Sequence, residues 1–260
     1  MRAFSSSVAL FLLASVCVAI YLSGLFGGFL FDDYQNIVEN AMLQGAGPTL
    51  DSWLAAALSS TAGMLKRPIS MLSFAISHHF FGTNPGAFKA INLIIHITNG
   101  VIIYWLCVKL IPLLTSKNEP AGAPSNYRIL ALLVTGIWLL HPLHVSSVLY
   151  VVQRMNLLSA LFILLGLISY ASARARSLEG RPGLLLGLMV TALCLILATL
   201  SKENGVLLMA YVLVVESICF RLDLTPSPEA TQSPFVGTTG LLLTLRLSTL
   251  LGLELRSLAS

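Results

Sequence analysis

Long apolar stretches separated by short polar segments run through most of the chain. The first, residues 8–30, contains no charged residue and is long enough to cross a bilayer. Five further stretches follow it, so the pattern predicts an all-α polytopic membrane protein with about six transmembrane helices. The predicted spans are residues 8–30, 90–114, 129–144, 157–173, 183–200 and 205–220.

A long loop, residues 31–89, separates the first two spans and carries apolar segments of its own. Leu50 to Leu58 predicts a short amphipathic helix capped by Asp51 or Ser52. Residues 69–81 are apolar but interrupted by Ser and His, which is typical of a helix that lies along a membrane surface. We therefore expect this loop to bear short interfacial helices.

Composition agrees with the membrane class. The chain has 260 residues, of which 56% are hydrophobic and 10% charged, whereas a soluble domain carries about 25% charge. The net charge of +4 is scattered between apolar segments, which argues against a nucleic-acid surface. The four cysteines lie within apolar segments and are not spaced for metal binding, so they read as small hydrophobic residues.

A change in composition near residue 222 divides the chain into two regions. Residues 1–222 form the predicted transmembrane domain. Residues 223–260 are rich first in Pro, Ser and Thr and then in Leu and Gly, without a clean further span. We interpret this tail as a flexible or interfacial segment, or as the product of a truncated or frame-shifted reading frame.

Orientation is predicted from Lys and Arg, which favour cytoplasmic loops. The bias places the N-terminus in the cytoplasm, and the first apolar run is too long for a signal peptide and lacks a cleavage site. This topology brings the loop 31–89 and the turns 141–156 and 201–204 to the same outer face. Each of these segments carries ionisable residues, so the outer face is where we look for chemistry.

Asp32 and Asp33 stand where the first span ends. Ionised groups are costly beside lipid, so an acidic pair there indicates either a polar site or the start of a solvated loop. As a catalytic pair, one carboxylate would be the general base that deprotonates an acceptor hydroxyl. The other would position substrate or hold a divalent cation, Mg²⁺ or Mn²⁺, although the metal remains unknown.

Basic and imidazole side chains follow on the same face. Lys66 and Arg67 could bind a phosphate, and the alternative is anchoring on lipid headgroups. Lys202 could serve the same purpose, while Lys202 next to Glu203 could also be a salt-bridged turn. His-x-x-His alone is a weak metal signal, so His141 and His144, with Arg154, are predicted to contribute to an outer polar site.

Taken in order, these motifs resemble one family. The motifs are Phe31-Asp32-Asp33, Arg67-Pro68-Ile69-Ser70, Asn84-Pro85, Asn92-x3-His96, His141-Pro142-Leu143-His144-Val145, Arg154-Met155-Asn156-Leu157-Leu158-Ser159 and Ser201-Lys202-Glu203. The series over residues 8–220 is similar to the membrane half of the transmembrane-and-tetratricopeptide-repeat proteins, within the GT-C superfamily of glycosyltransferases. Superfamily members usually have about twice as many spans, and the 34-residue repeat period is not found here.

The resemblance implies transfer of a sugar from a polyprenyl-phosphate carrier to a hydroxyl of a protein or glycan on the outer face. It implies that Asp32 or Asp33 is the catalytic base and that Lys66, Arg67, Arg154 and Lys202 are candidates for the donor phosphate. His141, His144 and Glu203 would be supporting polar residues. The style of the match favours a bacterial inner membrane, with the endoplasmic reticulum membrane as the alternative.

Two other functions stay open. A transporter would place ionisable residues near the middle of the membrane and often shows internal repeats, whereas the charges here gather at the outer ends. A catalytically silent membrane subunit or fragment is the second alternative, and it would assemble with a separately encoded C-terminal half.

Overall fold

The computed structural model describes residues 6–115 and 127–220, and within these ranges it contains helices and their connections but no strand. Five helical stretches there are long and apolar enough to cross a membrane: Ser6–Phe26, Pro85–Leu114, Val151–Leu178, Leu184–Ser201 and Glu203–Phe220. The prediction of an all-α polytopic membrane protein is therefore confirmed. The predicted tail, residues 223–260, lies outside the described ranges.

The α-helices are α1 (Ser6–Tyr21), α2 (Ala41–Gln44), α3 (Leu50–Ala57), α4 (Pro68–Phe81), α5 (Pro85–Thr115), α6 (Tyr127–Leu139), α7 (His144–Leu149), α8 (Arg154–Leu178), α9 (Leu184–Ser201) and α10 (Leu208–Val215). Three 3-10 segments, Leu22–Phe26, Val151–Gln153 and Glu203–Leu207, and two π segments, Tyr34–Val38 and Glu216–Phe220, extend or connect them.

The third predicted span, residues 129–144, ends too late. Helix α6 stops at Leu139, and His144 begins the separate short helix α7. Pro142 lies between them, and a proline disfavours helical backbone at the preceding residue. The described α6 has 13 residues, which gives a rise of about 20 Å, less than the hydrocarbon thickness.

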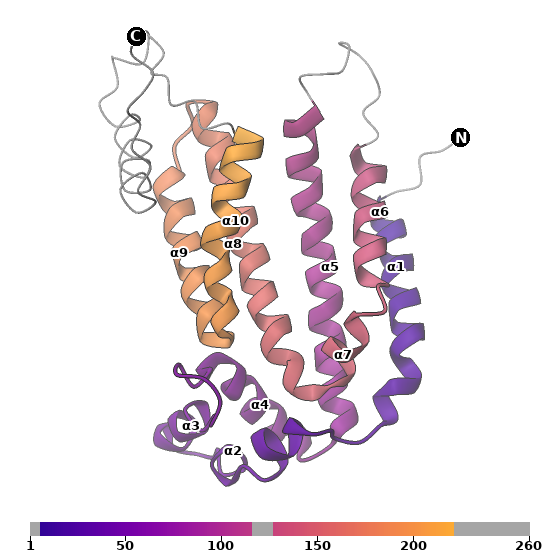
Figure 1. Cartoon of the computed structure of the whole chain (residues 1–260), viewed down its shortest axis with the longest axis vertical. Helices are drawn as coiled ribbons and strands as arrows, with labels where there is room; N and C mark the ends of the chain where they lie inside the picture. The colour runs from indigo at the N-terminus through magenta and orange to yellow at the C-terminus, as the bar shows by residue number, and fades with distance from the viewer. Residues whose placement is uncertain (1–5, 116–126, 221–260) are drawn as a thin grey trace, which may run out of the picture. The chain divides into compact units, whose positions relative to one another are not determined.

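The long helices pack side by side as a bundle (Figure 1), in which α1 contacts α6, α6 contacts α5, α5 contacts α8, and α8 contacts both α9 and α10. The α8–α9 interface is close because it uses small residues. A Cβ added at Gly187 of α9 would collide with Ala173 of α8, and in the same way one at Gly166 of α8 would collide with Leu208 of α10. Small residues at helix contacts are the usual means of close packing within a membrane.

Helices α2, α3 and α4 of the loop 31–89 lie together at one end of this bundle (Figure 1). The predicted helix near residue 50 is α3, but its cap is Thr49, whose side chain accepts from the Ser52 N–H, and not Asp51 or Ser52. Pro68 begins α4 at a position where a missing N–H costs nothing.

A buried apolar cluster fixes the loop on the bundle. Its residues come from the π segment, from α2 to α5 and from the start of α8: Ile37, Leu43, Ala56, Met71, Phe74, Ala75, Phe88, Val151 and Met155. The cluster therefore connects the loop to the segment that precedes and begins α8, which is also where the predicted site residues gather.

Candidate functional site

The predicted site residues lie around Tyr150–Met155, the chain segment that leads from α7 into α8. Asp33 reaches this segment from the end of the first span, and Arg67 reaches it from the start of α4. The turn after α9 joins the same region, because the Ser70 hydroxyl donates to the Ser201 carbonyl at 2.8 Å.

Asp33 is fully buried, and both of its carboxylate oxygens accept backbone hydrogen bonds. Oδ1 accepts from the Val152 N–H at 2.7 Å, and Oδ2 accepts from the Leu30 N–H at 2.9 Å. Burial raises the pKa of Asp33, and the backbone donors and the nearby Lys89 oppose that rise. In this structure Asp33 fastens the end of the first span to the start of α8, and it does not face an incoming substrate.

Asp32 has the opposite environment, because its side chain is exposed. Its backbone N–H donates to the Tyr150 hydroxyl at 3.0 Å, and the ring of Phe31 packs edge-on against the same tyrosine. Phe31 itself has a φ of 38°, a left-handed conformation that is uncommon for an aromatic residue. Of the adjacent pair, Asp32 is therefore the carboxylate that a substrate can reach.

Arg154 is the largest fully buried side chain in the described ranges. Its guanidinium donates to four acceptors: the Asn92 side chain at 2.8 Å, the Ser73 carbonyl at 3.1 Å, the Ser77 hydroxyl at 2.7 Å and the Phe88 carbonyl at 3.0 Å. Its charge also lies over the ring of Phe74, 4.8 Å from the centroid. Burial and these acceptors occupy its donors in this structure, so the role of Arg154 as a donor-phosphate ligand stays a prediction.

Arg67 lies at the surface of the same region, with 19% of its side chain exposed. Its Nε donates to both oxygens of Glu203, at 3.1 and 3.0 Å, and Nη2 is 3.0 Å from Glu203 Oε2. Nη1 approaches the sulfur of Met155 at 3.4 Å. Arg67 and Glu203, which are distant in the sequence, are thus brought together as an ion pair.

The backbone that presents Arg67 is strained. Lys66 and Arg67 have φ values of 55° and 47°, and two successive left-handed residues without a glycine are rare. Gly63 has a φ of 76° and passes so close to the Glu203 carboxylate that a Cβ there would collide with it. The loop is thus folded over Glu203, and Lys66 remains exposed beside it.

Lys202 is half-buried in the extended link between α9 and the following 3-10 segment. Burial lowers the pKa of Lys202, the positive charge of Arg67 lowers it further, and Glu203 opposes the change. Among the described residues no carboxylate forms an ion pair with Lys202. In the described part of the chain Arg67 thus has Glu203 as its ion-pair partner and Lys202 has none, an arrangement that an added anion would stabilise.

Asp33 and Arg67 both contact the segment at the start of α8. Val152 binds Asp33, and Met155 contacts Arg67. These residues are three apart in a helical segment, so their backbones are roughly 5 Å apart along its axis. The structure thus brings the Asp32–Asp33 turn and the Arg67–Glu203 pair to one end of the bundle.

The two predicted imidazoles lie at the turn between α6 and α7. His141 is exposed, whereas His144 is half-buried against Trp138 and His96, with ring centroids 4.5 and 5.0 Å apart. Burial lowers the pKa of His144, and the neighbouring His141 lowers it further. Both belong to an aromatic cluster, and no hydrogen bond within the described ranges joins them to Asp32 or Lys202.

A divalent cation was predicted on Asp32 or Asp33. Both oxygens of Asp33 already accept N–H groups, so the pair does not present two carboxylates to one ion. In the described part of the chain no group of three or more His, Cys, Asp or Glu side chains is placed to hold a metal. The residues present do not fit a two-carboxylate site, and we derive no chemical step through a cation.

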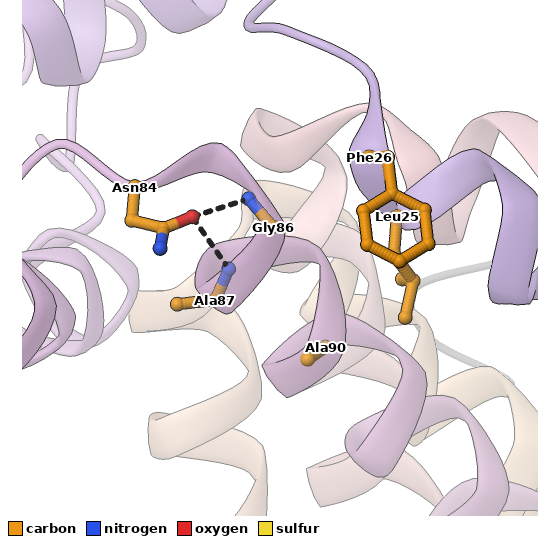
Figure 2. A pocket seen from close by; sticks show the side chains of 6 residues that line it. All are labelled: Leu25, Phe26, Asn84, Gly86, Ala87 and Ala90. Carbon is orange, nitrogen blue, oxygen red and sulfur yellow. Dashed lines mark hydrogen bonds between the residues drawn. The ribbon is translucent and has the colours of Figure 1, made fainter.

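An apolar hollow of about 430 Å³ opens beside the end of α1 and the start of α5. Figure 2 shows Leu25 and Phe26 on one side and the first turns of α5, with Ala87 and Ala90, on the other; the Asn84 side chain accepts from the Gly86 and Ala87 N–H groups and caps α5. Its lining holds no ionisable side chain. The hollow therefore does not contain the charged groups described above.

Three residues that matter here were not predicted as site residues, although Asn92 stands in one of the quoted motifs. Lys89 is 2% exposed and donates to the Gly27 carbonyl at 2.8 Å, close enough to Asp33 to attract it. Asn92 is fully buried and ties Arg154 to the Val151 carbonyl. Tyr150 carries the hydroxyl next to Asp32. For Lys89 and Asn92, a polar residue within an apolar stretch could have indicated a buried polar contact. Nothing in the sequence around Tyr150 indicated its contact with Asp32.

Comparison with known proteins supports the resemblance found in the sequence. Protein O-mannosyl-transferase TMTC4 of Homo sapiens is 31% identical over 205 residues, covering 74% of this chain and 27% of its own length. Protein O-mannosyl-transferase F38B6.6 of Caenorhabditis elegans is 26% identical over 217 residues, covering 82% of this chain and 28% of its own length. Protein O-mannosyl-transferase TMTC3 of Mus musculus is 27% identical over 212 residues, covering 79% of this chain and 21% of its own length.

No protein-family model matches the chain, and no solved structure matches it significantly. The chain spans about a quarter of the length of the curated relatives it matches. These relatives come from animals, so they give no support to the expected bacterial inner membrane. The multi-pass membrane setting itself agrees with the apolar helices.

Proposed function

The chain is a relative of the transmembrane-and-tetratricopeptide-repeat protein O-mannosyl-transferases, and on that premise we propose that it transfers mannose from a polyprenyl-phosphate donor to a protein hydroxyl. The relatives' names supply the sugar and the protein acceptor. A polyprenyl-phosphate donor fits a site that combines cations with apolar helices, since such a donor carries both an anion and a hydrocarbon chain.

Asp32 is the general base of this proposal. Its carboxylate accepts the proton of a serine or threonine hydroxyl while that oxygen attacks C1 of the mannose. The bond between C1 and the phosphate oxygen breaks, and the polyprenyl phosphate leaves with the bonding electrons. Asp33 supports the reaction only indirectly, because it holds the turn that exposes Asp32.

Lys202 and Arg67 stabilise the leaving phosphate, and Lys66 adds charge at the rim. The single observation that carries the proposal is that the half-buried Lys202 follows α9 next to the Arg67–Glu203 ion pair, at the end of the bundle where Asp32 is exposed. A phosphate would relieve the repulsion between Lys202 and Arg67, and such preorganised charge is an effective way to stabilise a leaving anion.

We place the site on the lumenal face of the endoplasmic reticulum membrane. The relatives come from animals, in which the lumen is the compartment that corresponds to the predicted outer face. The loop 31–89 and the turns 141–156 and 201–204 would then all face the lumen.

The test is transfer of radioactive mannose from polyprenyl-phosphate mannose to a peptide containing Ser and Thr, by the full chain in lipid nanodiscs. Asp32→Asn is expected to lower transfer at least a hundredfold without changing the thermal stability. Asp51→Asn, which alters another exposed carboxylate of the same loop on α3, is the matched control and should remain fully active. Full activity of Asp32→Asn would remove Asp32 as the base, and no transfer by the unaltered chain would favour the silent-subunit alternative.

A further inference from the structure

Tyr150 contacts Asp32 in more than one way. The Tyr150 hydroxyl accepts the Asp32 backbone N–H at 3.0 Å. Burial raises the pKa of Tyr150, and the Asp32 carboxylate raises it further. The ring packs edge-on against Phe31, with centroids 6.4 Å apart. One tyrosine thus contacts both the Asp32 backbone and the ring of the preceding Phe31.

The backbone on both sides of this contact is fixed. Tyr150 lies in the extended link between α7 and the 3-10 segment Val151–Gln153, and the next residues of that segment bind Asp33. On the Asp32 side of the contact, the Asp33 carboxylate also accepts from the Leu30 N–H. The tyrosine hydroxyl is therefore held at a set position relative to the turn that carries Asp32.

An exposed aspartate without such a contact would rotate among several side-chain conformations, and only some of them would face an acceptor hydroxyl. Misplacement of a catalytic group by about 1 Å can cost a hundredfold in rate. A neutral hydroxyl suits this purpose, because a cation at the same point would compete with the acceptor proton for the carboxylate.

We propose that Tyr150 is the positioning residue for Asp32: its hydroxyl accepts the Asp32 N–H and donates its own proton to one oxygen of the Asp32 carboxylate. The second carboxylate oxygen is then directed toward the acceptor hydroxyl. This inference rests on the proposed function, because it gives Tyr150 a role only if Asp32 acts as the base. Tyr150 acts through Asp32 and does not contact the sugar.

The experiment compares Tyr150→Phe with the unaltered chain in the nanodisc transfer assay. The phenylalanine keeps the ring that contacts Phe31 and removes only the hydroxyl. The expected result is a roughly tenfold lower kcat with KM values for donor and peptide unchanged within twofold. Tyr211→Phe removes a hydroxyl from an exposed tyrosine of α10 and serves as the matched control, with kcat unchanged.

A double variant separates positioning from a purely structural contact. In Asp32→Glu the carboxylate is displaced by one methylene, so the hydroxyl at residue 150 no longer meets it correctly. Adding Tyr150→Phe to Asp32→Glu is therefore expected to change kcat less than twofold, which is a non-additive result.

The other outcomes overturn either the role of Tyr150 alone or the proposed function as well. A normal kcat in Tyr150→Phe, together with inactive Asp32→Asn, overturns the role of Tyr150 and leaves the proposed function intact. A tenfold loss that persists in the Asp32→Glu background, accompanied by a lower melting temperature, shows a structural contact and also overturns it. Active Asp32→Asn, or no transfer by the unaltered chain, overturns the proposed function and the inference with it.

Discussion

Charged residues at the loop end of the bundle fall into two regions with opposite surroundings. The buried region consists of Asp33, Lys89 and Arg154, which are at most 2% exposed. The accessible region consists of Asp32, Arg67 and Lys202, which lie at least partly open to solvent. Members of the two regions are interleaved along the chain, and Asp32 and Asp33 are adjacent.

The difference between these regions lies in their hydrogen-bond partners. In the buried region, backbone carbonyls, backbone N–H groups and neutral side chains surround each charge, as for Arg154 with its four acceptors. In the accessible part of the described residues, Arg67 pairs with the Glu203 carboxylate and Lys202 forms no ion pair. A buried charge with all its partners stabilises structure, whereas a charge with incomplete partners is available for a ligand.

The largest expected effect comes from removing the centre of the buried region. Arg154→Met would leave buried acceptors of α4 and α5 without donors, and each unpaired buried group costs about 1–3 kcal/mol. We expect a loss of about 3 kcal/mol or more in the free energy of unfolding, measured by denaturant titration in detergent. Arg128→Met, at an exposed arginine of α6, is the control and should change it by less than about 0.5 kcal/mol.

Arg154→Lys sharpens this test, because lysine keeps the charge but lacks the planar fork that reaches several acceptors at once. We expect it to be destabilised nearly as much as Arg154→Met. Stability equal to that of the unaltered chain in both variants would show that Arg154 does not belong to a structural region.

A second test compares the two adjacent aspartates. Asp33→Asn retains one acceptor oxygen but turns an amide NH₂ toward a backbone N–H, so one of the donors from Leu30 and Val152 loses its partner. We expect a loss of about 2 kcal/mol in the free energy of unfolding. Asp32→Asn should leave the stability within about 0.5 kcal/mol. An equal loss of unfolding free energy in the two variants would contradict the division into a buried and an accessible region.

The third effect concerns donor binding in the accessible region. Lys202→Gln removes one of the two cations proposed for the phosphate, and we expect the KM for polyprenyl-phosphate mannose to rise about tenfold, or about 1.4 kcal/mol. Lys66→Gln, at an exposed neighbour, is expected to raise the KM less than threefold, because exposed charges contribute little. An unchanged KM in Lys202→Gln would remove this residue from the donor site.

The sequence alone could predict the helical class, the positions of most helices and the gathering of charges at one end. Hydrophobic length determines these features directly, since a bilayer demands long apolar helices. The end of the third span is predicted too late because the apolar run is followed past Pro142, although a proline disfavours helical backbone at the residue before it. The sequence could not distinguish Asp32 from Asp33, because which of two adjacent carboxylates is buried depends on contacts with Val152, more than a hundred residues away.

Arg154 shows the same limit for the basic residues. In the sequence it stands beside polar residues on the predicted outer face, as a phosphate ligand would. Its actual partners are brought by α4 and α5, at separations of 62 to 81 residues. Arg67 and Lys202 look no different in the sequence, and only the packing of the loop end leaves them accessible.

The smallest expected effect is a pH dependence that should come from the buried region. The pKa of Asp33 in the folded chain is raised from its ordinary value of 3.8, chiefly by burial. Between these two pKa values the folded chain binds more protons than the unfolded chain, so stability should fall as the pH rises through this window. The contribution is fully present below about pH 3.8 and is lost above the raised pKa.

Thermal unfolding of the unaltered chain and of Asp33→Asn, measured from pH 3.5 to pH 7 (about the range over which carboxyls titrate), tests this sign. The unaltered chain should lose stability with rising pH relative to Asp33→Asn, and Asp32→Asn should follow the unaltered chain. A rising stability instead would mean that the N–H groups of Leu30 and Val152 and the charge of Lys89 outweigh burial. Asp33 would then be an ionised structural anchor, and the buried region would be held together by charge rather than by neutral hydrogen bonds.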